Sequence, residues 1–207
     1  MPNQIDRQTA DKLLVAAEEA FAKSGIDRVS VRQINHLAGQ RNTSAVRYHF
    51  GSKEGLLEAL IEQRMGEVEE ERASALEVLD ATSSPMSVED LIRVLVEPLA
   101  SRVCREPSWG CWVRVLSQLL SIRGDAYQSI WQHEHDQTSR EIFRRLRKKL
   151  SHLPKLVWQQ RAADLRIWST SSLCERARLL ESGARPPLGR QAYIVNLVTT
   201  LSHALSA

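Results

Sequence analysis

Cationic and polar side chains gather between residues 23 and 53, and their chemistry suits contact with nucleic acid. Six lysine and arginine residues stand there against one aspartate, a net charge of +5, whereas the whole chain carries only +3. Hydrogen-bonding side chains lie among these cations: Gln33, Gln40, Asn42, Thr43, Ser44, Tyr48 and His49. Arginine can pair bidentately with guanine, and asparagine or glutamine with adenine, for about 1–3 kcal/mol of discrimination each. This stretch therefore predicts a surface that reads base edges.

The elements that must position these side chains are two short helices joined by a tight turn at Ala38 and Gly39. Ser30 is placed to cap the first helix, because its hydroxyl can accept an otherwise unpaired N–H of the first turn. Apolar residues at helical spacing then give that helix one buried face: Val31, Ile34, Leu37 and Ala38. Gly39 can supply the positive φ just past its end.

The second short helix is expected to begin with Asn42 or Thr43 as its cap and to carry Ala45, Val46, His49 and Phe50. Ser52 is expected to cap a longer helix that follows Gly51. Two short helices across a glycine turn form a helix-turn-helix, whose second helix can enter the major groove of DNA.

This segment resembles the N-terminal DNA-binding domain of the TetR family of bacterial transcriptional regulators. The matching residues are Val31-Arg32-Gln33-Ile34, Ala38-Gly39 and Tyr48-His49-Phe50-Gly51-Ser52-Lys53-Glu54. Three features depart from the family pattern. Asn35 stands where a small alanine is usual, the turn of Gln40-Arg41-Asn42 is one residue longer, and Arg47 falls where tyrosine is commonest.

The resemblance implies a DNA-binding domain over residues 1–53 and a helical effector-binding and dimerisation domain over residues 54–207. Six side chains are expected to face the groove: Arg41, Asn42, Thr43, Ser44, Arg47 and Tyr48. Phosphate contacts are expected from Ser30, Arg32, His49 and Lys53, with Gln33 and Gln40 completing the surface. The implied function is a repressor that a small molecule releases from a palindromic operator in double-stranded DNA.

Length and composition agree with a soluble helical protein. The chain has 207 residues, of which 43% are hydrophobic and 26% are charged, enough to bury a substantial core. The odd cysteine count, with no close pair and no export signal, indicates reduced thiols and a cytoplasmic location. The longest uncharged run, residues 191–207, is too short and too polar to span a bilayer, so no membrane partner is expected.

Helical periodicity continues along the rest of the chain, without strand-like alternation, and predicts an all-α fold. The expected helices cover residues 7–24, 52–79, 88–105, 107–122, a segment ending near 150, 155–181 and 191–205. Pro98 is expected to kink or end its helix near Glu97. The acidic run Glu67, Glu69, Glu70 and Glu71 is interpreted as a solvated helix face. The basic end of the helix near residue 149 is interpreted as a match to the helix dipole, with an anion site as the alternative.

Four tryptophans fall on the helices that would surround a central cavity: Trp109, Trp112, Trp131 and Trp168. Aromatic cavities with few polar groups are typical small-molecule sites, so these residues are the candidate effector pocket, with ordinary core packing as the alternative. The last two helices look apolar on more than one side. The resemblance implies that they form a four-helix bundle with a second copy, although a buried hairpin in a monomer would show a similar pattern.

Residues for catalysis or for a cofactor do not stand out. The sequence lacks a GxSxG motif, a phosphate-binding glycine loop and a CxxC pair, and residues 133–136 (His-Glu-His-Asp) alternate around a helix rather than share one face. Neither enzymatic activity, a metal nor a cofactor is therefore expected. Two alternatives remain. A helical ligand-binding protein without a DNA role would leave the +5 cluster unexplained, and an all-helical enzyme is disfavoured because no nucleophile–base pair or metal set can be assembled from the sequence.

Overall fold

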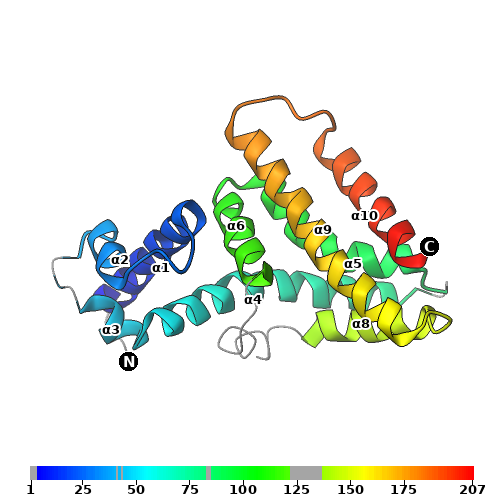
Figure 1. The fold of residues 1–207 in the computed structure, drawn as a ribbon, viewed down its shortest axis with the longest axis horizontal. Helices are drawn as coiled ribbons and strands as arrows, with labels where there is room; N and C mark the ends of the chain where they lie inside the picture. The colour runs from blue at the N-terminus through cyan, green and yellow to red at the C-terminus, as the bar shows by residue number, and fades with distance from the viewer. Residues whose placement is uncertain (1–3, 41, 43, 83–84, 122–136) are drawn as a thin grey trace. The chain divides into compact units, whose positions relative to one another are not determined.

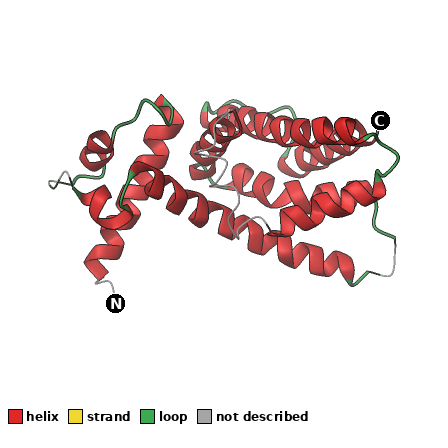
Figure 2. Cartoon of the chain, turned by 60° about the horizontal axis from the view of Figure 1, so that its bottom comes forward, coloured by secondary structure: helices red, strands yellow, loops and turns green. Residues whose placement is uncertain are grey.

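The structure is a computed structural model that describes residues 4–40, 42, 44–82, 85–121 and 137–207. Every regular element within these residues is an α-helix, and none of them lies in a strand (Figure 2). The prediction of an all-α fold is confirmed. The chain divides into two compact units, Met1–Met65 and Gly66–Ala207, each of which is described by itself.

The first unit holds α1 (Gln4–Ser24), α2 (Val31–Leu37), α3 (Ala45–Phe50) and the start of α4 (Lys53–Asp80) (Figure 1). The predicted apolar stripe of α1 is its core, since Leu13, Ala17 and Phe21 are completely buried. This stripe faces α2 and α3, both of which pack on α1. The start of α1 at Gln4, earlier than residue 7, adds a turn before that stripe.

A buried ion pair joins α1 to α4 within this unit. Arg64 donates from Nη2 and Nε to Oε2 of Glu18, at 2.8 and 3.0 Å, and Glu18 is only 4% exposed. Burial raises the pKa of Glu18, although the guanidinium of Arg64 acts in the opposite direction. This contact lies within the first unit, which extends along α4 to Met65.

The second unit is built around α5 (Val88–Arg105). Helix α5 packs against α6 (Ser108–Ser121), α8 (Gln137–Lys149), α9 (Lys155–Glu181) and α10 (Arg190–Ser206). Pro98 was predicted to kink or end this helix near Glu97; the helix does not end there, because α5 continues through Pro98 to Arg105. Leu95 and Leu99 are buried on either side of the proline, and this packing outweighs the single hydrogen bond that proline cannot donate.

The acidic run of α4 is not simply solvated. Arg102 of α5 donates to Glu71 at 2.9 Å and pairs with Glu67, and Glu69 lies 3.6 Å from the guanidinium of Arg72. Arg72 is itself buried and donates to the carbonyl oxygen of Leu95 and to the hydroxyl of Ser139. The run therefore ties α4 to its neighbours in the second unit.

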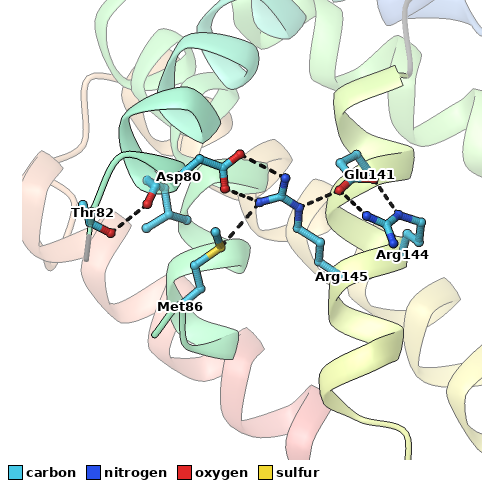
Figure 3. A network of polar contacts seen from close by, with 7 residues as sticks. Asp80, Thr82, Met86, Glu141, Arg144 and Arg145 are labelled. Atoms are coloured by element: carbon cyan, nitrogen blue, oxygen red, sulfur yellow. Dashed lines mark hydrogen bonds and ion pairs between the residues drawn. The ribbon is translucent and has the colours of Figure 1, made fainter. Parts of the chain in front are cut away.

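A second polar network joins the end of α4 to α8 (Figure 3). Arg145 of α8 donates from Nη2 to Oδ2 of Asp80 at 3.0 Å and from Nε to Oε1 of Glu141 at 2.6 Å. Arg144 donates to the same Glu141 carboxylate. Nearby, Arg147 donates to the carbonyl oxygens of Leu150 and Leu153, beyond the end of α8. These bonds favour the structural interpretation of the basic end of α8.

Helices α9 and α10 run side by side at the end of the chain (Figure 1). The hydroxyls of Ser172 and Tyr193 lie 2.9 Å apart, and the guanidinium of Arg176 stacks 4.7 Å from the Tyr193 ring. Burial raises the pKa of Tyr193 to about 12. These contacts join α9 to α10.

Candidate nucleic-acid interface

The N-terminus of α2 is capped by a reciprocal pair of hydrogen bonds between Ser30 and Gln33. The hydroxyl of Ser30 accepts the backbone N–H of Gln33, and Oε1 of Gln33 accepts the backbone N–H of Ser30 at 2.8 Å. Two otherwise unpaired donors are satisfied in this way, as in a capping box. The predicted cap at Ser30 is confirmed, and Gln33, predicted as a surface contact, has its side-chain oxygen engaged in it.

The turn after α2 forms as predicted. Helix α3 begins one or two residues later than predicted, because its cap residue is Ser44 and not Asn42 or Thr43. Gly39 adopts φ of +69°, the left-handed conformation predicted for it. The cap position of α3 is Ser44, whose side chain makes no capping bond. Asn42 instead accepts the N–H of Ser44 on Oδ1 at 2.9 Å, and Thr43 lies outside the described residues.

The N-terminus of α3 also donates a hydrogen bond to α2. Oδ1 of Asn35 accepts the backbone N–H of Val46 at 3.1 Å, and Asn35 is only 1% exposed. The sequence shows this residue only as a polar interruption of the apolar face of α2. Its role was missed, because the spacing of residues along one helix does not reveal a bond to another element.

Glycine and serine at the end of α3 set its connection to α4. Gly51 adopts φ of +76°, and the hydroxyl of Ser52 accepts the N–H of Gly55 at 3.1 Å. The predicted cap at Ser52 is therefore confirmed. Backbone hydrogen bonding at Glu54, followed by its bond with the Ser52 hydroxyl, lowers the pKa of the Glu54 carboxyl. Together these contacts hold α3 at both of its ends.

We call residues 23–53 the head. Most of the residues predicted to contact DNA, where the structure describes them, lie on its surface. The exposed members are Ser30, Arg32, Gln33, Asn42, Ser44, Arg47 and Tyr48, and the half-buried ones are Gln40, His49 and Lys53. Tyr48 is 74% exposed, and its ring meets His49 edge-on at 4.8 Å. Lys53 has its ammonium group 5.8 Å from the centre of the Phe21 ring. Arg41 and Thr43 lie outside the described residues.

The four tryptophans of the predicted effector pocket have different environments. Trp109 is 1% exposed, donates to Glu106 and stacks on Arg102. Trp112 is completely buried, and its indole N–H finds no acceptor among the described residues. Trp168 is 49% exposed on α9, and Trp131 lies outside the described part of the chain.

A groove of about 810 Å³ lies between α4 and α5 in the second unit. Its apolar lining is Ala75, Val78, Leu79, Val94 and Pro98, and its polar lining includes Glu70, Glu97 and Arg93. None of the three described tryptophans of the predicted pocket, Trp109, Trp112 and Trp168, lines it. Small-molecule pockets commonly measure roughly 300–1,000 Å³, so this groove is large enough for one.

Large apolar side chains are exposed on α9, on α10 and on the loop between them. They are Leu156, Val157, Ile167, Trp168, Leu180, Leu188 and Val195, and each is between 37% and 76% exposed. Such a set on two adjacent helices is more than the scattered apolar exposure of an ordinary monomer surface.

Other kinds of site find little support in the described residues. No group of three potential metal ligands occurs among them, and Cys104, Cys111 and Cys174 are half-buried cysteines that form no disulfide with one another. The His-Glu-His-Asp stretch at residues 133–136 lies outside the described chain. In the described part, no helix has the length and apolar character needed to cross a membrane.

A short, doubly anchored helix exposed in a cationic head is the arrangement of a helix-turn-helix DNA-binding protein. Comparison with known families agrees, because the family of bacterial regulatory proteins called tetR matches residues 13–60. The comparison with curated proteins gave no match.

Solved structures show the same fold over the whole chain. A HlyIIR mutant has 16% identity, covering 100% of this chain and 99% of that chain, with a TM-score of 0.60. A tetR-family regulatory protein from Rhodococcus RHA1 has 15% identity, 96% and 97% coverage and a TM-score of 0.60. The fatty acid degradation regulator FadR from Bacillus halodurans has 14% identity, 96% and 95% coverage and a TM-score of 0.59. The head thus matches the tetR family of bacterial regulatory proteins, and the chain has the fold of TetR-family regulators.

Proposed function

We propose that this protein binds a palindromic operator as a homodimer and represses transcription until a small molecule releases it. The observation that carries the proposal is α3, which exposes Arg47 and Tyr48 from a helix held at both ends. A helix fixed in this way can present side chains to base edges at a constant angle. Because a transcription regulator acts where the DNA lies, a cytoplasmic location follows from this proposal.

The proposed contacts divide by chemistry. Arg47, Tyr48 and Ser44 on α3, with Arg41, Asn42 and Thr43 before it, read the major groove. Ser30, Arg32, His49 and Lys53 hold the sugar–phosphate backbone and so set the register of α3. Gln33 and Gln40 complete the edge of this surface. Base contacts give sequence preference, and phosphate contacts give affinity that depends on salt.

Dimerisation through α9 and α10 is supported by the apolar side chains that these helices expose. Ile167 and Trp168 on α9 and Val195 on α10 are each more than 40% exposed. Pairing two copies through these helices would cover them. A dimer presents two recognition helices, and two helices about 34–36 Å apart can read successive major grooves, whereas one reads only a few base pairs.

Effector release is proposed to act through α4. The groove between α4 and α5 touches Ser74, Ala75 and Val78 of α4, and the same helix begins beside α3 at Lys53. A ligand that binds one arrangement of α4 more tightly than another would shift the population between DNA-binding and released states. The tryptophan region is the second proposed location, supported by buried Trp112, whose indole N–H has no acceptor among the described residues.

Enrichment of random-sequence duplexes by the purified full chain, followed by gel shifts at several salt concentrations, tests the DNA-binding proposal. We expect one palindromic sequence to be enriched, and we expect the logarithm of its affinity to fall linearly with the logarithm of salt concentration. A chain that enriches no sequence and ignores duplex DNA at low salt would instead favour a ligand-binding protein without a DNA role.

Release can be tested with the small-molecule fraction of a bacterial cell extract added to the enriched complex. We expect the extract to dissociate the duplex from the wild type. Ala75→Trp, which fills the α4–α5 groove, should resist dissociation if the effector binds in that groove. Trp112→Phe should resist dissociation if the effector binds in the tryptophan region. Equal release from all three proteins would remove both proposed sites.

A further inference from the structure

The recognition helix α3 depends on other parts of the head for its N-terminal hydrogen bonds. Its cap residue, Ser44, makes no capping bond with its own side chain. The N–H of Ser44 goes to Oδ1 of Asn42, and the N–H of Ala45 goes to the carbonyl oxygen of Asn42 at 3.3 Å. The N–H of Val46 goes to Oδ1 of Asn35, which is eleven residues earlier and on another helix.

Asn35 is built into the junction between α2 and α3. Its side chain is 1% exposed, and its backbone carbonyl oxygen accepts the N–H of Gln40 at 2.9 Å. One residue therefore holds the turn through its backbone and α3 through its side chain. A buried N–H that loses its acceptor is costly, because water cannot replace the lost partner.

We propose that Asn35 is the positioning residue of the recognition helix, setting the angle at which α3 presents Arg47 and Tyr48. The proposal rests on the proposed reading of DNA by α3. An isolated helix of six residues has no stability of its own, since helices shorter than about 12 residues are marginal in water. The orientation of α3 therefore follows from its contacts, and the Asn35 bond to Val46 joins its first turn directly to α2.

A residue that positions α3 should control sequence preference, whereas a residue that only packs in the core should control stability. Loss of the bond lets α3 shift or fray at its N-terminus, which disturbs base contacts next to Val46. The cations of the head remain, so attraction to DNA of any sequence is largely kept. Asn35 should therefore govern the preference for the selected duplex over random duplex more than it governs affinity for random duplex.

The test compares three variants of the full chain. Asn35→Leu keeps a side chain of similar size and removes the acceptor oxygen. Asn35→Asp removes the amide nitrogen but keeps an acceptor oxygen. That oxygen faces the N-terminus of α3, where the helix dipole favours negative charge. Ile34→Val is the matched control, because Ile34 is completely buried on the same helix and the substitution weakens packing without touching the hydrogen bond.

Two measurements are made on each variant: hydrogen–deuterium exchange of the peptide that covers α3, and affinity for the duplex that the wild type enriches against a random duplex. For Asn35→Leu we expect exchange in α3 to rise and the affinity ratio to fall about tenfold, the effect of one unpaired buried donor. Asn35→Asp should recover most of both values, and Ile34→Val should resemble the wild type.

The inference is overturned if Asn35→Leu and Ile34→Val behave alike, or if Asn35→Asp is as impaired as Asn35→Leu. Failure of the proposed function has a different signature. In that case the wild type shows no preference for any duplex, while the exchange measurement still reports whether Asn35 holds α3.

Discussion

Arg47 and Lys53 are two cations of the head with different proposed tasks. Arg47 is exposed on α3, where a bidentate contact to guanine is within the chemistry of its side chain. Lys53 is half-buried at the start of α4, with its ammonium group near Phe21. A point charge held there suits a phosphate better than a base.

We expect Arg47→Ala to relax sequence preference at one base position, at a cost of about 1–3 kcal/mol for the preferred sequence. Lys53→Ala should weaken binding to all duplexes alike and reduce the salt slope by about 1. Repeating the duplex enrichment and the salt titration with each variant separates the two effects. If Lys53→Ala changed the preferred sequence and Arg47→Ala weakened binding to all duplexes alike, this division of the surface would be refuted.

At pH values near 7, Glu141 should contribute to stability as a carboxylate. Its hydrogen bonds with Arg144 and then Arg145 lower its pKa from 4.5 to about 2. A lowered pKa stabilises the fold above pH 4.5, and that contribution is lost as pH falls towards 2. Because the side chain is 31% exposed, solvent screening should limit the gain to about 1 kcal/mol or less.

We therefore expect Glu141→Gln to melt below the wild type at pH 7 and to approach it as pH is lowered. Glu175→Gln is the control with a smaller expected effect, since Glu175 is 55% exposed and, within the described residues, forms its salt bridge with Arg178 of the same helix. Thermal melts across this pH range provide the measurement. A gap that widens on acidification would contradict the assigned direction.

Among the elements, α4 is the one that belongs to both compact units, and its two glycines have opposite surroundings. A Cβ added at Gly55 would collide with the backbone carbonyl oxygen of Phe50, at the end of α3. A Cβ added at Gly66 would meet no atom within 4 Å. The first glycine is required by the approach of α3, and the second only weakens a helix.

Gly55→Ala should destabilise the protein by about 1–3 kcal/mol, the usual result of overpacking. Gly66→Ala should stabilise it by roughly 0.5–1 kcal/mol, because alanine favours the helix more than glycine does. Denaturant unfolding of both variants gives the comparison. If Gly55→Ala were as stable as the wild type, α3 could not lie against the first turn of α4 as described.

For the whole molecule, the decisive quantity is the number of copies that bind DNA together. The exposed Trp168 lies on the proposed dimer face of α9 and α10, whereas Val78, 69% exposed, belongs to α4, which is not part of that proposed face. We expect the wild type to sediment as a dimer and Trp168→Glu to shift it towards monomer. Operator affinity should then fall at least about tenfold, because the second half-site no longer adds to the first.

Val78→Glu, which places the same charge on another exposed apolar residue, should leave the dimer intact. A dimer that survives Trp168→Glu would move the interface away from this part of α9. A wild type that is monomeric at the concentrations that bind the operator would exclude the proposed dimer altogether.

Local features were predictable from the sequence because their partners are near in the chain. The cap at Ser30 depends on Gln33 three residues later, and the end of α2 depends on the φ freedom of Gly39. The same holds for α9, whose bounds at Lys155 and Glu181 were predicted correctly. The net charge of the head, +5, also follows directly from the sequence.

Only the tertiary structure decided contacts between residues far apart in the chain. It joined Asn35 to Val46, Arg102 to Glu67 and Glu71, and Glu18 to Arg64, and it carried α5 through Pro98. Helical periodicity says which face of a helix is buried but not which element will cover it. Polar partners across helices therefore appear only when the core brings those helices together, and for that reason the bond that holds α3 was invisible in the sequence.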